Sequence, residues 1–441
     1  MKKDVGSSKR KMTKKIEELA RTYFPEAVSL RRLLHEKPEL GWCEYVATSV
    51  VAAQLKALGY QVQTGPSVCK ADARMGVPSE AILEREWLRA RSEGIPEREL
   101  EPMRGGFTGL IAVLHQGPGP VAALRLDLDA LPLTEKTGLP FASSHPGVMH
   151  ACGHDGHTAM GVGIARIMKA MGDQWQGTLK LIFQPAEEGV RGGRAVAEAG
   201  HVDDVDFLLG AHIFGRSRPE GDCDLVPGAS GSFATTKLDA EFTGRAAHAG
   251  SFPEKGLSVM PAMAAAVTAL YGIPRHSKGA TRINVGRMEA GGGRNVVADH
   301  GILELEIRGA GTEINSYMEE QARRILLGAA KMHGVSCRIQ TAGGAPSVVS
   351  SLSLCERIRT LCLEQFPQIR PTSYLQGPSE GSEDFSWLME RVKARGGQAA
   401  FPLLLTDTAA PGHTPEFDFP ETVLHTGMTV LSGVLFDILK K

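Results

Sequence analysis

The chain is organised around the stretch His150-Ala151-Cys152-Gly153-His154-Asp155-Gly156-His157. It combines a thiol, imidazole rings and a carboxyl group, and its glycines let backbone and side chains crowd together. Thiolate and imidazole groups suit a borderline-soft divalent metal such as zinc. The alternative is a polar turn whose side chains only satisfy hydrogen bonds. The interpretation therefore depends on the sequence that surrounds the stretch.

Apolar runs that predict buried strands lie on both sides of this stretch. The pattern over 158–171 predicts a helix, and the predicted strands cover 110–114, 121–126, 178–183 and 206–211. Strands that alternate with helices indicate an α/β fold with a mostly parallel sheet covered on both faces. Such sheets bind ligands just beyond the carboxyl ends of their strands.

The pattern changes from about residue 231. Predicted strands and helices then follow in the order β-α-β-β-α-β, at 233–242, 257–271, 282–287, 302–307, 314–332 and 335–341. This is the order of the ferredoxin-like α+β unit. We therefore predict one α/β domain formed by residues 1–230 and 343–441, interrupted by a ferredoxin-like domain at 231–342. The charged, irregular segment 66–106 reads as an insertion in the first domain.

The composition restricts partners and compartment. The 441 residues include 49 basic and 50 acidic side chains, so no global charge draws the protein to nucleic acid or to anionic membranes. The N-terminal segment lacks the apolar core of a signal peptide, and no run approaches the ~18–20 apolar residues of a membrane span. Seven scattered cysteines favour a reducing compartment. We expect a cytoplasmic protein without nucleic-acid or membrane partners.

Further metal donors lie downstream, in Glu187-Glu188, His212 and His413. Each alone has a simpler explanation, because adjacent glutamates are usually a solvated turn and a histidine beside an apolar strand is usually a core residue. Together with Cys152 and His154 they exceed the four ligands of one zinc ion, and they suit two metals ~3.5–4 Å apart. Adjacent carboxylates point in different directions. One glutamate can therefore bind metal while the other takes a proton from the attacking water.

Several motifs carry a resemblance to a known family. They are MHACGHDGH (149–157), QPAEEG (184–189), GRAAHAG (244–250), GSEDF (381–385) and GH (412–413). The chain resembles the amidohydrolase branch of the aminoacylase and glutamate-carboxypeptidase metallopeptidases over nearly its whole length. Within that branch, the 66–106 insertion with its Arg74-Met75-Gly76-Val77-Pro78 is similar to that of the aminobenzoyl-glutamate hydrolase A subunits.

The resemblance implies a two-domain dimer with two divalent metal ions, zinc or manganese. Cys152 is expected to bridge the metals, and the remaining ligands are expected to be His154, Glu188, His212 and His413. Glu187 resembles the general base. His248 resembles the histidine of the inserted lid and dimerisation domain that polarises the scissile carbonyl. Asp129 is expected to support a ligand without binding metal, whereas Asp155 and His157 receive structural roles.

The implied substrate is an N-acyl amino acid, most specifically p-aminobenzoyl-glutamate. Asn295 and Arg308 are expected to hold its free carboxylate. The alternative for Arg308 is a surface pair with Glu306. Other N-acyl or indole-acetyl amino acids are alternative substrates. The chain is expected to form a homodimer or a heteromer with a related subunit, and a partner-dependent subunit without activity of its own is a further alternative.

Two rival motifs are present. Gly377-Pro378-Ser379-Glu380-Gly381 fits the nucleophile elbow of serine hydrolases, with Asp418 and His425 following in the order of that class. Pro378 is awkward for so sharp a turn, and this interpretation leaves the histidine and cysteine cluster unexplained. Gly161 and Gly163 lie within a helix pattern and lack the third glycine of a dinucleotide site.

Overall fold

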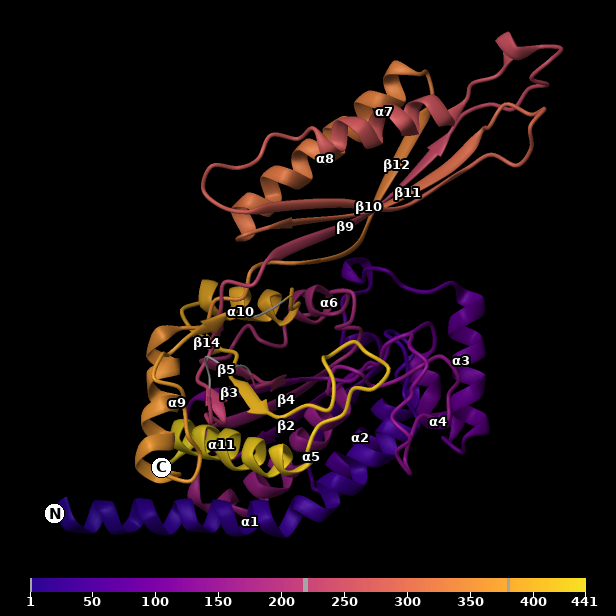
Figure 1. Ribbon diagram of the computed structural model, residues 1–441. Helices are drawn as coiled ribbons and strands as arrows, with labels where there is room; N and C mark the ends of the chain where they lie inside the picture. The colour runs from indigo at the N-terminus through magenta and orange to yellow at the C-terminus, as the bar shows by residue number, and fades with distance from the viewer. Residues whose placement is uncertain (1, 217–220, 379–380) are drawn as a thin grey trace. The chain divides into compact units, whose positions relative to one another are not determined.

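The computed structural model describes residues 2–216, 221–378 and 381–441. The chain forms two compact units (Figure 1). Unit 1 comprises Val349–Pro378, Asp384–Lys441 and the described residues up to Ser230, and unit 2 comprises Gly231–Val348 with residues 381–383. The boundary expected at residue 342 falls inside strand β12 (Ser336–Ala345), and the second unit continues to Val348 because this strand pairs with β9 (Ala234–Thr243).

Unit 1 is built on a six-stranded sheet of order β1-β2-β4-β3-β5-β14. Its strands are β1 (Gln61–Thr64), β2 (Leu110–His115), β4 (Thr178–Gln184), β3 (Val121–Asp127), β5 (Phe207–Gly210) and β14 (Gln398–Ala400). The last four run parallel, whereas β1 and β2 are antiparallel to their neighbours. The α/β class is confirmed, and the sheet is mixed because β2 returns against β4 after the insertion.

Helices cover both faces of this sheet (Figure 1). On one face α5 (His154–Ala170) packs against α1 (Lys2–Glu36) and α11 (Thr422–Leu439). On the other, α6 (Gly193–Glu198) packs against α10 (Phe385–Ala394). Helices α2 (Tyr45–Ala57) and α9 (Leu352–Gln365) also belong to unit 1. A Cβ at Gly161 would lie 2.4 Å from Leu126 Cδ1, so this glycine lets α5 approach the sheet closely.

Helix α11 was not singled out in the sequence analysis. It is the one helix of the described chain that is long and apolar enough to cross a membrane. However, 78% of the helix is buried inside the structure, where it packs on α5 and α1. A buried helix between two others is part of the core of unit 1.

Short strands continue the framework of unit 1 next to the main sheet. β15 (Leu403–Thr406) runs parallel to β6 (His212–Gly215) and antiparallel to β7 (Leu225–Val226). β13 (Gly377–Pro378) pairs with β8 (Ala229–Ser230). Thus His212, which was expected to close a strand, instead begins β6 and is held by the ladder to Leu403.

The insertion folds onto unit 1 as part of its core. It contains α3 (Glu80–Ser92), α4 (Glu97–Leu100) and short 3₁₀ turns. Trp87 of α3 is buried, and Trp42 Nε1 donates a hydrogen bond to Met75 O at 2.9 Å. The Trp42 bond ties the start of the insertion to the segment that leads into α2, and Tyr45 of α2 donates from its hydroxyl to Leu83 O of α3.

Unit 2 has a four-stranded antiparallel sheet of order β10-β11-β9-β12, with β10 (Thr281–Ala290) and β11 (His300–Gly309). Helices α7 (Val259–Tyr271) and α8 (Thr312–Met332) lie together on one face of the sheet (Figure 1). The chain order is the expected β-α-β-β-α-β. Beyond the sheet, the ladder between β9 and β11 continues to the bridge of His248 with Val296.

Candidate active site

The candidate residues follow parallel strands that end at one edge of the main sheet. Asp127, the last residue of β3, pairs with Gln184, the last residue of β4, and β5 runs parallel beside β3. Asp129, the Glu187-Glu188 pair and His212 come shortly after these strand ends. Helix α5 begins at His154 rather than at residue 158, because Gly153 turns the chain with a φ of 89°. Cys152 and His154 therefore lie at the N-terminal end of a helix.

Cys152 lies at the centre of the cluster. Its Sγ is 3.4 Å from His212 Nε2 and 3.4 Å from His413 Nε2, which in turn is 3.5 Å from Glu188 Oε1. Two groups, Cys152-His154-His212 and Cys152-Glu188-His413, each hold their possible ligand atoms within 4.8 Å of one another. Because the two groups share only the thiol, the arrangement suits two neighbouring cations with Cys152 between them.

His154 and His212 each turn Nε2 toward the cluster. His154 Nδ1 lies 2.8 Å from Asp129 O, and His212 Nδ1 lies 2.6 Å from Ile213 O. A carbonyl oxygen can only accept, so each Nδ1 carries the proton and each Nε2 can bind metal. Within the described chain, His154 Nε2 and Glu188 Oε1 are buried without a hydrogen-bond partner. Unpaired buried acceptors are costly. The residues present therefore fit a divalent cation.

The pKa shifts of the cluster differ between its members: burial lowers the pKa of His212 well below its usual value, whereas three other proposed ligands shift toward proton uptake. Burial lowers the pKa of His154, but Asp127 and Cys152 outweigh it and hold that pKa well above its usual value. Burial raises the pKa of Glu188 to about 7 and also raises the pKa of the Cys152 thiol. These shifts favour proton uptake, and divalent cations displace protons from such ligands.

Two carboxylates hold the loop that carries Glu187 and Glu188. Asp129 Oδ1 accepts from Glu187 N at 3.0 Å, and its Oδ2 accepts from Glu188 N at 2.9 Å. Glu44 accepts from Ala186 N at 2.7 Å. The position of Asp129 agrees with the supporting role expected for it. Glu44 was missed from the sequence, because nothing local signals a contact 142 residues away.

Backbone strain gathers around the same residues. Ala186, Val190 and His413 have φ values of 51°, 57° and 62°, in the left-handed region that favours glycine. Such conformations cost about 1–3 kcal/mol each and persist only where the surrounding structure imposes them. Here the backbone N–H groups of Ala186 and Glu187 donate to the carboxylates of Glu44 and Asp129, which fixes the loop on one side of the cluster.

Asp155 and His157 have structural contacts. His157 Nδ1 lies 2.7 Å from Asp127 Oδ1, and its Nε2 accepts from Ile213 N at 2.8 Å, so both ring nitrogens are engaged. Asp155 Oδ2 is buried and accepts from Arg31 Nε and His35 Nδ1, both at 2.8 Å. These bonds tie α5 to strand β3 and to α1.

The serine-hydrolase alternative gains no support. Ser379 lies outside the described residues. Asp418 Oδ1 accepts from Arg31 Nη2 at 2.6 Å, and His425 packs edge-on against Phe24 with ring centroids 6.1 Å apart. Asp418 is therefore committed to an arginine rather than to orienting a histidine.

The remaining candidates lie in unit 2 and do not form one cluster. His248 is exposed, and its Nδ1 accepts from Gly250 N at 3.2 Å and Ser251 N at 3.1 Å, which leaves Nε2 as an outward donor. Asn295 is next to it, because Ala249 N donates to Asn295 O at 2.9 Å. Arg308 lies at the other end of β11, about 27 Å from its start at ~3.4 Å per residue.

Arg308 is engaged by Glu306 in this structure. Its Nε and Nη2 donate to the two carboxylate oxygens of Glu306 at 2.6 and 3.2 Å. This is the surface pair expected as the alternative from the sequence, and both side chains are only partly buried. A substrate carboxylate would have to compete with Glu306 for the same guanidinium.

The fold and the cluster define the class of a metal-dependent hydrolase: cysteine, histidine and carboxylate donors converge beyond the strand ends of an α/β sheet, next to a spare glutamate. The sequence profile of Peptidase family M20/M25/M40 matches residues 123–437, and the chain belongs to this family.

Relatives sharpen this assignment. The chain is 44% identical to indole-3-acetyl-aspartic acid hydrolase of Enterobacter agglomerans, over 95% of this chain and 97% of that protein. It is 42% identical to one subunit of the p-aminobenzoyl-glutamate hydrolase of Escherichia coli (strain K12), over 92% and 94%. The crystal structure of an aminobenzoyl-glutamate utilization protein from Klebsiella pneumoniae superimposes with a TM-score of 0.82 at 37% identity, over 96% and 98%. The expected family resemblance is confirmed, and the chain is a metallo-amidohydrolase.

Proposed function

We propose that this enzyme hydrolyses the amide bond of N-acyl amino acids, with p-aminobenzoyl-glutamate as its substrate and p-aminobenzoate and glutamate as products. The observation that carries the proposal is the convergence of Cys152, His154, Glu188, His212 and His413 beside Glu187. Indole-acetyl-aspartate is the second candidate, because the relative named for that activity is 44% identical to this chain. The two named substrates differ in the acyl group and in the amino acid, which is glutamate in one and aspartate in the other. In both, the amino acid is acidic.

The proposed ligand set would hold two divalent ions, zinc or manganese. Cys152, His154 and His212 would hold one of them, and Cys152, Glu188 and His413 would hold the other. When bound, such ions activate a water molecule and polarise the scissile carbonyl. The thiolate favours zinc, whereas imidazole and carboxylate ligands also accept manganese.

Glu187 is the proposed general base. Its Oε2 lies 3.8 Å from His154 Nε2, beside the ligand set, and its backbone is fixed by Asp129. From there it takes the proton of the attacking water and returns it to the leaving nitrogen as the amide bond breaks. Its neighbour Glu188 faces His413, so the two adjacent glutamates divide proton transfer and metal binding between them.

His248 and Asn295 are proposed to act in the site of a second subunit. The donor on His248 Nε2 suits the developing oxyanion, and Asn295 lies beside it. Within one copy of unit 2, the distance between Arg308 and this pair is greater than the length of an acyl amino acid. One substrate can therefore contact all three residues only if two subunits contribute.

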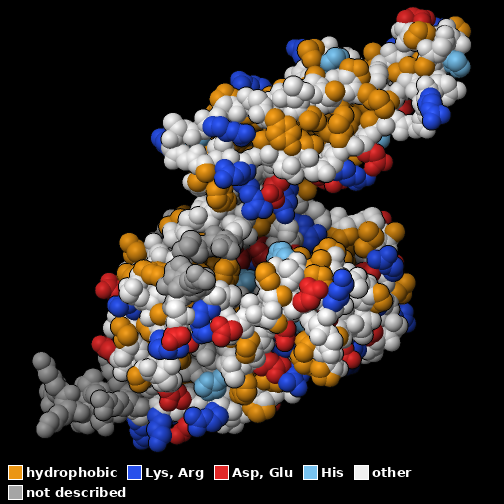
Figure 2. All heavy atoms as spheres, in the orientation of Figure 1, with side chains coloured by type: hydrophobic (Ala, Val, Ile, Leu, Met, Phe, Trp, Pro, Cys, Tyr) orange, Lys and Arg blue, Asp and Glu red, His pale blue; other side chains and the backbone are white. Residues whose placement is uncertain are grey.

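The surface of unit 2 supports assembly. Helix α7 carries no charged residue, and Figure 2 shows hydrophobic side chains gathered over α7 and α8. Among them, Met260, Tyr271 and Leu327 are about half exposed. Exposed apolar patches of this kind mark protein interfaces. We propose a homodimer or a heteromer with a related subunit.

The proposal includes a cytoplasmic location, supported by seven cysteines that are all free.

Metal analysis combined with a hydrolysis assay tests the proposed function. The isolated wild-type protein, supplied with zinc or manganese, should bind two ions per chain and hydrolyse p-aminobenzoyl-glutamate. Cys152→Ala should lose metal and turnover while its circular dichroism spectrum stays unchanged, because the core of unit 1 is separate from the thiol. Full metal occupancy and full rate in this variant would overturn the dinuclear assignment. Activity that appears only after a second protein is added would support the partner-dependent alternative.

A further inference from the structure

A cavity of about 670 Å³ opens beside Glu188 in unit 1. The insertion forms one wall with Pro78, Ile82 and Arg85, and the loop after Glu188 forms another with Gly189 and Arg191. Leucine and proline side chains supply much of the remaining lining. The insertion is therefore placed to shape whatever lies next to the metal ligands.

The carboxylates that line this cavity already accept hydrogen bonds from arginine side chains, apart from that of the proposed metal ligand Glu188. Glu39 is buried and accepts from Arg89, and Glu86 accepts from Arg85 and Arg89. These pairs neutralise the acidic side chains of the wall, so they leave no negative charge there to attract a cation or to repel an anion strongly.

Arg191 differs from the other arginines of the cavity. Its Nε donates to Glu188 O at 2.8 Å and its Nη1 donates to Gly76 O of the insertion at 3.2 Å. In the described chain it has no carboxylate partner, and its Nη2 has no acceptor. A Cβ at Gly41 would lie 2.3 Å from Nη2, so the glycine leaves room for the guanidinium. Arg191 is thus a positive charge fixed by backbone carbonyls, with Nη2 left without an acceptor.

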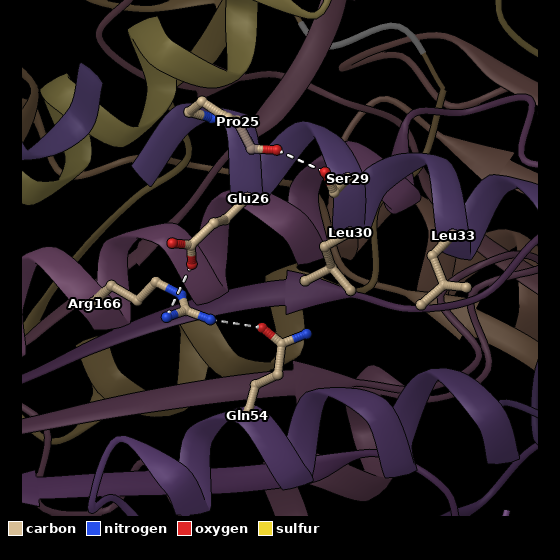
Figure 3. A pocket seen from close by; sticks show the side chains of 7 residues that line it. All are labelled: Pro25, Glu26, Ser29, Leu30, Leu33, Gln54 and Arg166. Carbon is tan, nitrogen blue, oxygen red and sulfur yellow. Dashed lines mark hydrogen bonds and ion pairs between the residues drawn. The ribbon is translucent and has the colours of Figure 1, made fainter. Parts of the chain in front are cut away.

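A second cavity of unit 1 shows the contrast (Figure 3). It has a volume of about 370 Å³ and is lined by α1, α2 and α5. Its arginine, Arg166, is paired with Glu26 at 3.0 Å and donates to Gln54 at 3.1 Å. A cation that already has a carboxylate and an amide partner offers little to an anionic ligand.

We infer that Arg191 binds the side-chain carboxylate of an acidic amino acid in the substrate, and that the insertion holds the guanidinium in position for it. The inference rests on the proposed function, because the cavity matters to a substrate only if Glu188 belongs to the active site. The side-chain carboxylate of a glutamyl or aspartyl residue lies only a few bonds from the scissile nitrogen, and Arg191 is bonded to the backbone of Glu188. The positive charge of Arg191 and its available Nη2 donor suit a charge-assisted hydrogen bond to a carboxylate.

The test compares p-aminobenzoyl-glutamate with p-aminobenzoyl-glutamine, which replaces only the side-chain carboxylate by an amide. Wild type should prefer the acid in kcat/KM. Arg191→Gln should lower kcat/KM for the acid about 10- to 150-fold, the range of a hydrogen bond to a charged group, with little change for the amide. Arg85→Gln is the matched control in the same cavity. Arg85 is exposed and paired with its neighbour Glu86, so its loss should leave the preference intact.

Gly41→Ala sharpens the test, because its added methyl group would lie 2.3 Å from Arg191 Nη2 and displace the guanidinium without removing the charge. The methyl group would also lie 3.0 Å from Ala186, so the metal content of this variant is measured alongside. It should shift the preference in the same direction as Arg191→Gln. A purely structural role for Arg191, which also holds the Glu188 backbone, predicts equal losses for both substrates together with reduced metal content. That result, or an acid preference retained in Arg191→Gln, would overturn the inference.

Binding measurements separate this inference from the proposed function. The acid and the amide are titrated calorimetrically into metal-loaded wild type and Arg191→Gln. If wild type binds the acid more tightly than the amide and the variant does not, the carboxylate site is supported. If wild type also hydrolyses neither compound, only the proposed function is contradicted. Equal affinity of wild type for the two compounds would overturn the assignment of Arg191.

Discussion

Two sets of candidate residues, one in each unit, are arranged very differently. In unit 1, His413 and Cys152 are 261 residues apart in the sequence, yet Nε2 and Sγ lie 3.4 Å apart. In unit 2, His248 and Arg308 are much nearer in the sequence but lie toward opposite ends of one sheet. Parallel strands bring their carboxyl ends to one edge, so residues that follow them converge. Antiparallel strands place successive ends at opposite edges, and residues there are separated.

This difference separates residues that can act within one chain from residues that need a second subunit. The proposed metal ligands and Glu187 all lie in unit 1. The substrate-binding candidates of unit 2 do not form one site within a single copy of the unit. Arg308 in addition donates to Glu306 instead of facing an open pocket with the other candidates. Substitutions in the two units should therefore differ both in size and in whether another subunit can compensate.

The largest effect is expected at Glu187. Glu187→Gln keeps the size of the side chain but removes the base, and general acid–base catalysis typically contributes ~10²–10⁴-fold. We expect kcat to fall by at least this range while the metal content, measured by elemental analysis, stays at the wild-type level. Loss of metal would mean that Glu187 and Glu188 have exchanged roles.

His248→Ala is expected to cost ~10²–10³-fold in kcat, the loss typical of one oxyanion donor. A mixing experiment tests directly whether His248 of unit 2 acts in the site of a second subunit. When inactive His248→Ala chains are mixed with inactive Glu187→Gln chains, one site of each hybrid dimer should contain both native residues, and partial activity should return. Verified hybrids that show no recovery would place His248 in its own subunit's site or outside catalysis.

Asp129→Asn should act on metal affinity rather than on the chemical step. Its carboxylate accepts from the backbones of both glutamates, and residues in such supporting positions typically contribute about 10- to 100-fold in metal affinity. We expect a competitive chelator to remove the metals from the variant at a correspondingly lower concentration. With saturating metal, kcat should recover most of its value. A kcat that stays low at full occupancy would instead give Asp129 a direct part in catalysis.

Much of this site was predictable from the sequence, for reasons that particular residues show. The two glutamates come shortly after the apolar strand β4, and the parallel sheet rule predicts that residues in such positions meet. Cys152 and His154 were predictable as metal donors from the density of thiol and imidazole groups in their stretch. Glu44 was not predictable, because its contact with Ala186 depends on tertiary packing across 142 residues. Arg191 could not be found from the sequence either, since only the structure shows that its partners are backbone carbonyls. The boundary at residue 342 followed from a strand predicted to end at residue 341, whereas β12 continues to Ala345 in its ladder with β9.

The smallest effect is expected at Arg308, where the structure provides a competitor. A hydrogen bond to a charged group contributes ~1.5–3 kcal/mol, or roughly 10- to 150-fold. A substrate carboxylate must first displace Glu306 from the guanidinium, so we expect Arg308→Lys to lower kcat/KM for p-aminobenzoyl-glutamate by only about the lower bound, ~10-fold. The same variant should distinguish poorly between this substrate and its α-carboxamide.

Glu306→Gln provides the matched control, because it weakens the competitor and leaves Arg308 in place. If Arg308 binds the α-carboxylate, Glu306→Gln should strengthen the preference for the free acid over the α-carboxamide, whereas Arg308→Lys should weaken it. Measuring kcat/KM for both compounds on wild type and the two variants gives opposite shifts in that case. If neither variant changes the preference, the Arg308–Glu306 pair is only a surface ion pair, and the α-carboxylate must be held by other residues, such as Asn295 of a second subunit.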